Sequence, residues 1–534
     1  MTIKWHPSIV KVLEARYLLK DKKGIVIETP DEMLIRVARH VAGAEKPELQ
    51  DTWFKQFLSI MMDLEFLPNS PTLMNAGKEL GQLSACFLLP IEDDLSNIFE
   101  QVKQVALIHK SGGGTGIVFS NIRPKNSMVN STHGAASGPV SFMRVFDTAT
   151  DVVKQGGVRR GANMGILAVN HPDILDFITC KANKTAFTNF NLSVAITDNF
   201  LKAVEQGNGF PLRNPHTQEK TYVKARDIFD TLCHQAWLTG EPGLIFIDTI
   251  NAHNVTPWLG RIEGTNPCGE QPLLPYESCN LGSIDLSKLV VKGKIDWDRL
   301  VTIVAIAVRF LDDVIEVNKF PTIKIERKTK MTRKIGLGVM GWADMLIKLG
   351  IRYDSDQAIK LAKRLMMTIR ETAHMTSRDL GTEKGMIFPL LKRRNATLTT
   401  VAPTGTLSLI ANCSSGIEPL FSKNYTKTVM GDLTIDMSEA YAGVDPNLMV
   451  TSVDLTVEHH IATLAAFQEY TDNAVSKTII LPETAKVADV KKAFLAAHAA
   501  GCKGITVYRN KSREDAPLQD KTFLSECTDG KCQI

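Results

Sequence analysis

The chain has 534 residues, 44% of them hydrophobic and 22% charged, which is typical of a globular protein with enough apolar residues for a large core. Its net charge of +4 is small for this length and gives no support for a protein that coats nucleic acid or a membrane surface. The first residues lack a signal-peptide pattern, no run of about 18 apolar residues could span a membrane, and the nine cysteines are irregularly spaced. We therefore expect a cytoplasmic protein with mostly reduced thiols.

Residues 1–66 predict an N-terminal helical region, because apolar residues recur near the helical period between charged ones. The run Pro-Asp-Glu at residues 30–32 indicates the start of one helix, and residues 51–64 predict another.

Short apolar runs that follow this region are expected strands, and from residue 190 onward such runs alternate with helices, which is typical of a largely parallel sheet covered by helices. The expected strands are 84–90, 117–119, 165–169, 193–196, 244–247, 399–401 and 505–508. The glycine-rich loop 111–116 is expected to break regular structure. We predict an α/β domain over residues 67–510 and a flexible, polar tail over 511–534.

Residues 266–270 read Asn-Pro-Cys-Gly-Glu and place a thiol between an amide and a carboxylate. Pro267 fixes one backbone angle and Gly269 permits unusual ones, which suits a tight loop. Side-chain alternation in such a loop would point Asn266, Cys268 and Glu270 to one side, toward one small substrate. The alternative is a turn with a buried cysteine, since free Cys often packs as a small hydrophobe.

Other cysteines fall into three groups. Cys86 lies in the expected strand 84–90, and Cys279 lies in the run Ser-Cys-Asn-Leu-Gly. Cys527 and Cys532 lie in the tail, where an accessible pair suits thiol–disulfide exchange better than packing. The tail has no His, so a four-ligand zinc site is not expected, and we predict no metal site made by protein ligands. The cysteines interpreted as structural are Cys180, Cys233, Cys413 and Cys502.

The run Ala-Pro-Thr-Gly-Thr at residues 402–406 follows an expected strand, and backbone amides and hydroxyls at such a turn can hold phosphate oxygens. It lacks the Gly-Lys-Ser/Thr ending of a P-loop. The run 336–341 matches the dinucleotide fingerprint G-x-G-x-x-G, but basic residues rather than a hydrophobic strand precede it. We therefore favour close helix packing there over a nicotinamide site.

Two glycine-rich loops, 111–116 and 154–162, have basic residues beside them. Together with Asp93, Asp94 and Ser96 they could bind the ribose and phosphates of a second nucleotide. The alternative is a pair of ordinary surface turns.

Taken together, these motifs resemble the catalytic subunits of ribonucleotide reductases, in family order from about residue 60 to residue 510. The resemblance also rests on Ser-Ala-Cys-Phe, Pro-Asn-Ser-Pro-Thr-Leu, Gly-Gly-Gly-Thr-Gly and Gly-Gly-Val-Arg-Arg-Gly-Ala. The runs 472–478 and 504–509 resemble class II, the adenosylcobalamin-dependent variety.

The resemblance implies a ten-stranded α/β barrel, made of two parallel five-stranded halves set antiparallel around a central finger loop. In that loop Cys268 becomes a thiyl radical that takes the ribose 3′ hydrogen, Glu270 acts as general base and Asn266 holds the ribose hydroxyls. Cys86 and Cys279 protonate the departing 2′-hydroxyl and supply two electrons as they form a disulfide.

The same resemblance implies the remaining sites and partners. The implied substrate contacts are Thr72, Ala85, Cys86, Asn266, Pro267, Cys268, Gly269, Glu270, Ala402, Pro403, Thr404, Gly405 and Thr406. A deoxynucleotide effector would bind at a homodimer interface, with Asp93, Arg123, Gly113 and Gly114. Cys527 and Cys532 would carry electrons from a thioredoxin-like protein to the active-site disulfide.

Class I reductases are the alternative, since they resemble this chain but need a separate radical-generating subunit and use a tyrosine pair. The sequence has no Tyr-Tyr, which favours adenosylcobalamin as the radical source. The cobalamin pattern Asp-x-His-x-x-Gly is absent, as the class II family allows. A further alternative is a non-catalytic nucleotide-binding protein. Such a protein would be expected to lack a catalytic residue, whereas Cys86, Asn266, Cys268, Glu270 and Cys279 are all present. We expect ribonucleoside diphosphates as substrates.

Overall fold

A computed structural model describes residues 3–129, 133–153, 161–183, 185–422, 425–430, 433–436, 441, 443–512 and 518–520. Most of the predicted loop 154–162 and both tail cysteines, Cys527 and Cys532, lie outside this part of the chain. Within it, no helix combines the length and the apolar character needed to cross a membrane.

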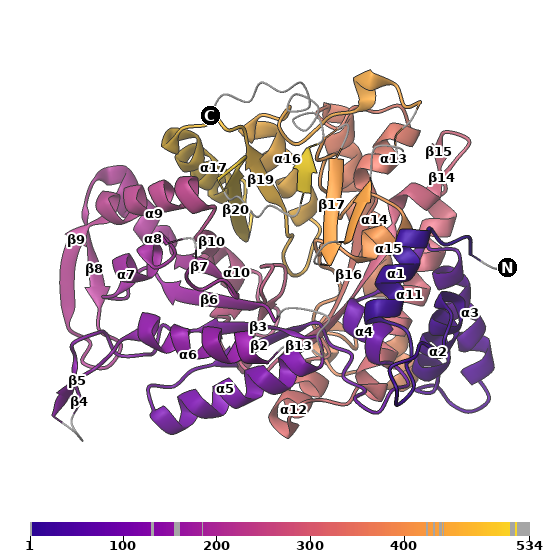
Figure 1. The fold of residues 1–534 in the computed structure, drawn as a ribbon, viewed down its shortest axis with the longest axis horizontal. Helices are drawn as coiled ribbons and strands as arrows, with labels where there is room; N and C mark the ends of the chain where they lie inside the picture. Colours follow the sequence, from indigo (N-terminus) through magenta and orange to yellow (C-terminus); the bar gives the residue numbers. More distant parts are fainter. Residues whose placement is uncertain are drawn as a thin grey trace.

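Three helices open the chain: α1 (Pro7–Arg16), α2 (Pro30–Ala42) and α3 (Gln50–Met62). At the start of α2, the Thr29 side chain accepts from the Glu32 backbone amide, and the Glu32 carboxylate accepts from the Thr29 amide. Apolar faces of α2 and α3 are buried and pack against α11 (Trp297–Val317), which joins the N-terminal helices to the sheet (Figure 1).

The central sheet has ten strands in two groups. The first group is wholly parallel and comprises β2 (Cys86–Pro90), β3 (Gly114–Val118), β6 (Asn163–Ala168), β7 (Phe190–Ile196) and β10 (Gly243–Phe246). The second group contains two parallel pairs, β13 (Ser278–Asp285) with β16 (Ile335–Met340), and β19 (Thr478–Leu481) with β20 (Gly504–Arg509). The tenth strand, β1 (Phe66–Pro68), is antiparallel to β13.

The two groups meet antiparallel, at β2 with β13 and at β10 with β20. The regular ladders leave the sheet open between β16 and β19. Residues 399–401 cross this opening through isolated parallel bridges from Thr399 to Leu337 and from Val401 to Val475. The predicted α/β fold with two strand groups that meet antiparallel is thus confirmed. The second group differs from the prediction, because β1 runs antiparallel to β13 and residues 399–401 form an irregular segment where a regular strand was expected. The regular ladders of the described residues therefore do not close the predicted barrel.

Helices surround this sheet, with α5 and α6 packed together along one edge (Figure 1). Their bounds are α4 (Ser70–Asn75), α5 (Leu95–Lys110), α6 (Pro139–Val152), α7 (Ile174–Thr179), α8 (Asp198–Gln206), α9 (Ala225–Thr239), α10 (Ile247–Ala252), α12 (Ile323–Thr332), α13 (Trp342–Lys348), α14 (Asp356–Lys384), α15 (Leu407–Ala411), α16 (Val457–Gln468) and α17 (Val487–Ala499). The smaller strands are β4 (Met128–Val129), β5 (Gly134–Ala135), β8 (Gly209–Arg213), β9 (Lys220–Lys224), β11 (Gly264–Thr265), β12 (Pro272–Leu273), β14 (Val290–Val291), β15 (Lys294–Ile295), β17 (Tyr425–Met430), β18 (Leu433–Asp436) and β21 (Leu518–Asp520).

The hairpin of β11 and β12 carries residues 266–271 at its tip, and we call it the finger loop. It passes so close to β3 that a Cβ placed on Gly116 would lie 1.8 Å from the Thr265 carbonyl oxygen. The expectation that residues 111–116 break regular structure is therefore wrong for 114–116. These glycines belong to β3 because the finger loop fills the space that side chains would occupy.

Close packing of a neighbouring segment also corrects the interpretation of residues 336–341. They belong to the buried strand β16 and its end, and a Cβ on Gly338 would lie 2.1 Å from the Thr400 carbonyl oxygen. The close packing is thus against the segment 399–401 and the finger loop rather than against a helix.

We predict that Gly116→Ala lowers the free energy of unfolding by at least about 2 kcal/mol, because either the finger loop or β3 must shift. Gly209→Ala in β8 is the matched control, since its Cβ would meet only ordinary contacts at 3.8 Å, and it should change stability by less than about 0.5 kcal/mol. Urea unfolding of both variants measures the difference. Equal effects would show that the close approach has no energetic consequence.

Candidate active site

The finger loop tip is a tight turn in which the Gly269 amide donates to the Asn266 carbonyl oxygen at 3.1 Å. Gly269 has φ +81°, a conformation that favours glycine. Because residues 266–269 turn rather than extend, simple side-chain alternation does not describe the loop. Asn266 and Glu270 are buried, whereas Cys268 is exposed at the tip.

Cys86 and Cys279 occupy directly opposed positions on the antiparallel strands β2 and β13. Cβ atoms at opposed positions are roughly 4.5–5.5 Å apart, so a small shift would let the two sulfurs bond. Both side chains are buried, which raises the pKa of each thiol well above its ordinary value and keeps it protonated. The chain thus holds two buried thiols within reach of one another.

The finger loop contacts this dithiol directly. The Asn266 side-chain amide donates to Cys86 Sγ at 3.1 Å, and Cys86 Sγ lies 4.0 Å from Glu270 Oε1. Burial raises the pKa of Glu270 to about 7, so this carboxyl can both take and give a proton near neutral pH. Its second oxygen, Oε2, has no hydrogen-bond partner among the described residues and can receive a substrate hydroxyl.

Cys268 opens onto a cavity of about 530 Å³. Its lining includes residues of β7, β10 and β20, together with Pro403, residues 414–415 and residues 418–421. The lining is mostly apolar with a few hydroxyls and amides, and Lys477 is its one cation in the described part of the chain. Lys477 is fully buried and pairs with Glu418 at 2.7 Å.

Residues 402–406 form a turn before α15, as the sequence predicts for this run. Thr404 has φ +55°, and its hydroxyl oxygen accepts from the Gly416 amide at 2.8 Å. Gly405 is exposed and Thr406 is half-buried. Of the five residues, Pro403 lines the cavity, while Ala402 packs beside it.

Of the predicted substrate contacts, Pro267, Cys268, Gly269 and Pro403 line this cavity, and the others, including the buried Cys86, Asn266 and Glu270, do not. Thr72 in α4 is buried, and its hydroxyl donates to the Leu83 carbonyl at 3.0 Å. Ala85 precedes the dithiol, and its amide donates to the Cys279 carbonyl at 3.0 Å. The structure therefore brings Ala85 to the dithiol and does not bring Thr72 to the cavity.

The predicted effector residues separate into two places. Arg123 Nε pairs with Asp93 Oδ2 at 2.5 Å, and His216 Nε2 lies 2.8 Å from the same carboxylate. Gly114 instead lies opposite Cys86, where its Cβ would be 2.9 Å from the Pro267 ring, and Gly113 packs against Phe87 and Ile108. The structure does not bring Gly113 and Gly114 to the Asp93–Arg123 pair, because they lie at the other end of β3.

Two side chains that position the finger loop carried no motif signal. The Asn191 amide in β7 donates to the Pro267 carbonyl at 2.9 Å, and the Thr400 hydroxyl donates to the Glu270 carbonyl at 2.7 Å. Asn191 lies beside the expected strand 193–196 and Thr400 lies within the expected strand 399–401, but only the folded sheet brings these side chains to the finger loop.

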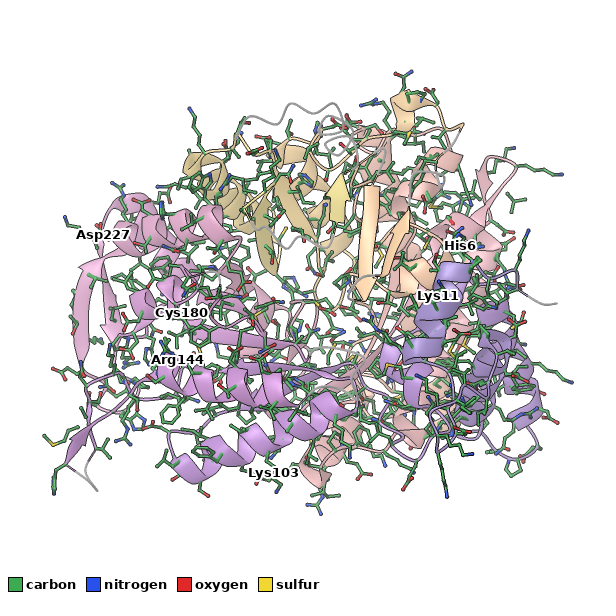
Figure 2. The ribbon with its side chains drawn as sticks, viewed as in Figure 1. His6, Lys11, Lys103, Arg144, Cys180 and Asp227 are labelled. Atoms are coloured by element: carbon green, nitrogen blue, oxygen red, sulfur yellow. The ribbon has the colours of Figure 1, made fainter. Side chains whose placement is uncertain are left out.

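Four further cysteines lie elsewhere, and Cys180 is among the magenta helices in Figure 2. Burial raises the pKa of Cys180, Cys233 and Cys502 to about 12, which leaves their thiols unreactive. Burial also raises the pKa of Cys413 well above its ordinary value.

Comparison with known proteins gives the family. The family model described as ribonucleotide reductase, barrel domain, matches residues 84–393 and 390–508, and the all-alpha domain model of the same family matches residues 7–81. The chain is 45% identical to a vitamin B12-dependent ribonucleoside-diphosphate reductase of Thermoplasma acidophilum, over 95% of this chain and 79% of the relative. A protein of the same description from Mycobacterium tuberculosis H37Rv is 44% identical, over 100% of this chain and 83% of the relative. A ribonucleoside-diphosphate reductase large subunit of variola virus is 29% identical, over 82% of this chain and 64% of the relative.

We predict that Glu270→Gln changes the pH dependence of stability. Because burial raises the pKa of Glu270 from 4.5 to about 7, its stabilising contribution is complete below pH 4.5 and is lost as the pH rises through 7. Relative to Glu270→Gln, the native chain should lose about 3 kcal/mol of unfolding free energy between pH 4.5 and pH 8. Urea unfolding across this pH range measures the difference in unfolding free energy. Glu48→Gln is the control, because Glu48 is exposed. A difference that does not vary with pH would contradict the buried-acid assignment.

Proposed function

The chain belongs to the ribonucleotide reductase family, and on that premise we propose that it is an adenosylcobalamin-dependent ribonucleoside-diphosphate reductase that makes deoxyribonucleotides. One observation carries the proposal: Cys268 is exposed at a cavity, and the same loop carries a buried base, Glu270, that contacts one thiol of a buried dithiol. The relatives named as vitamin B12-dependent cover nearly the whole chain, which favours this function over a class I subunit. We place the enzyme in the cytoplasm.

The cofactor, when bound, supplies the radical chemistry that converts the Cys268 thiol to a thiyl radical. Cys268 suits this role because the cavity reaches its sulfur, whereas Cys86 and Cys279 are buried. The thiyl radical takes the ribose 3′ hydrogen atom and returns it at the end of the cycle. Cys268 therefore stays outside the redox couple.

Glu270 and the dithiol carry out the reduction. Glu270 takes the 3′-hydroxyl proton, and the Asn266 amide holds a ribose hydroxyl. A protonated thiol of the Cys86–Cys279 pair gives its proton to the 2′-hydroxyl, which leaves as water. The pair gives up two electrons and two protons in total and becomes a disulfide, and this balances the reduction of one ribose.

The cavity lining suits the substrate and one part of the cofactor, since about 530 Å³ is too little to enclose a whole cobalamin together with a nucleotide. Pro403, Ser414 and Ser415 line the cavity beside the 402–406 turn, which suits the substrate phosphates. Leu244, Thr506 and Tyr508, from β10 and β20, line the same space. These side chains would contact an apolar part of the cofactor beside the exposed Cys268, and their mixed apolar and hydroxyl character suits that contact.

A dithiol on the tail completes the cycle. We assign Cys527 and Cys532 to reduce the Cys86–Cys279 disulfide by thiol–disulfide exchange, and a thioredoxin-like protein to reduce them in turn. Their exchange returns both protons to the active-site thiols.

We further propose a homodimer formed through α5, with a deoxynucleotide effector at Asp93 and Arg123. The N-terminal turns of α5 expose Leu95 to 62% and Phe99 to 55%, next to the Asp93–Arg123 pair. Large exposed apolar side chains on one helix are typical of a protein interface. Lys103 of the same helix lies at the outer edge of the molecule in Figure 2. A second copy packed there would cover both the apolar residues and the effector site.

We expect the purified chain to form deoxyribonucleoside diphosphate from a ribonucleoside diphosphate, a small dithiol and adenosylcobalamin, with no second protein added. Cys268→Ser should lower the rate at least about a thousandfold, because no other exposed thiol lines the described cavity. Cys180→Ala is the control and should keep most of the activity. Product formation by Cys268→Ser would rule out the thiyl mechanism, and no product from the native chain would rule out the cofactor assignment.

Sedimentation velocity tests the dimer. Phe99→Asp should halve the sedimenting mass, since it places a charge in an apolar interface. Leu495→Asp on α17 is the matched control, because Leu495 is also an exposed apolar helix residue, at 39%. A native chain that sediments as a monomer at micromolar concentration would contradict the dimer.

A further inference from the structure

A second cavity, of about 710 Å³, lies between α14, α16 and the segment that leads into β19, and we call it the rear cavity. It shares no lining residue with the cavity at Cys268. Its volume is in the range of small-molecule sites. Arg370 from α14, Asp472 before β19 and Lys503 before β20 line its inner end.

The charges of this inner end are unbalanced. Asp472 is the carboxylate there, and it already accepts from the Leu398 amide at 2.9 Å and lies 3.2 Å from His374 Nε2. Arg370 Nε lies 3.5 Å from Asp472, longer than a good hydrogen bond. Lys503 donates to the carbonyl oxygens of Asp472 and Asn473, at 2.7 and 2.6 Å, which leaves its charge without a carboxylate in contact.

The cations at this end also repel one another. Burial lowers the pKa of Lys503 to about 8; the Asp472 carboxylate opposes this shift, and the charge of Arg370 adds to it. Burial likewise lowers the pKa of Arg393, a nearby buried guanidinium, again opposed by Asp472 and aided by Arg370. Asp472 is thus shared among several cations. A bound anion would relieve both effects. Farther out, Lys363 and Glu469 form an ion pair at 2.7 Å and leave the imbalance unchanged.

Small apolar side chains form a large part of the remaining lining: Ile359, Ala462, Ala465, Ala466 and Ala500. The polar side chains of His253, Asn254, Gln468 and Thr471 lie among the other lining residues. Small side chains leave room for a flat ring, and such a wall beside a cationic end matches a base joined to a phosphate. A bare inorganic anion would not use this wall.

The inner end is connected to the finger loop by short hydrogen bonds. The Asp472 amide donates to the Thr399 hydroxyl at 2.8 Å, and the Ala474 amide donates to the Glu270 carbonyl at 3.0 Å. The Thr400 hydroxyl also donates to the Glu270 carbonyl. Residues 472–474 therefore touch the rear cavity at one end and the catalytic loop at the other.

We propose that the rear cavity binds a nucleoside phosphate, with its phosphate at Arg370 and Lys503 and its base on the alanine wall, and that its binding steadies the finger loop through residues 472–474. This site is separate from the active site and from the Asp93–Arg123 pair. Its effect on catalysis depends on the proposed reductase function, whereas ligand binding itself does not.

Equilibrium dialysis with ADP tests the site. The native chain should bind one more equivalent of ADP per chain than Arg370→Gln, in which affinity at this site should fall about tenfold or more with the loss of a charge-assisted contact. Arg370 is 43% exposed at its side chain, so the variant should fold. Arg378→Gln is the matched control, because Arg378 lies on the same helix and pairs with Asp379 outside the cavity, and it should bind ADP as the native chain does.

An unchanged ADP stoichiometry in Arg370→Gln would overturn the site. Inorganic diphosphate that filled the extra site as tightly as ADP would overturn the assignment of a nucleoside.

Hydrogen exchange tests the connection to the finger loop. ADP should slow amide exchange in residues 264–273 more in the native chain and in Arg378→Gln than in Arg370→Gln. Equal protection in all three would overturn the coupling. Both measurements are independent of turnover, so an inactive chain could still show the site, and an active reductase could still lack it.

Discussion

The close approach of the finger loop to the surrounding strands is the constraint on which the rest of the structure depends. A sheet that curves around a central hairpin has room for that hairpin only where its inward-facing positions lack side chains. Gly116 in β3 and Gly336 in β16 supply this space, against Thr265 and Gln271. The consequence is a tightly packed interior in which added side-chain volume at these glycines would displace the loop.

From that constraint the electrostatics of the site follow. Because the loop is pressed into the sheet, Glu270 loses water and its pKa rises to about 7, while Cys86 and Cys279 stay protonated. The tight turn at Gly269 leaves Cys268 exposed. In the proposed mechanism, one loop thus separates a sulfur that must meet a radical source from two sulfurs that must meet only the substrate.

The finger loop is also held by hydrogen bonds from both strand groups of the central sheet. Asn191 and Thr400 hold its backbone from opposite groups of the sheet, and Ala474 ties it to the segment behind it. A ligand that steadied this segment would act on the position of Glu270 without touching the substrate. The rear cavity, with its surplus of cations, lies where such a ligand would act.

The sequence by itself determined the chemistry and the general architecture. Runs such as Asn-Pro-Cys-Gly-Glu at 266–270, together with alternating strands and helices, predicted a catalytic thiol in a tight loop within an α/β fold. Local patterns carry this information because loop geometry and strand burial depend on neighbouring residues. Only the tertiary structure decided which distant groups meet. Cys86 faces Cys279 through strand pairing, the glycines of 114–116 and 336–338 proved to be strand residues that accommodate a hairpin, and Gly113 and Gly114 proved to lie far from Asp93. These outcomes depend on register and on the filling of space between segments far apart in the chain, and no local pattern encodes them.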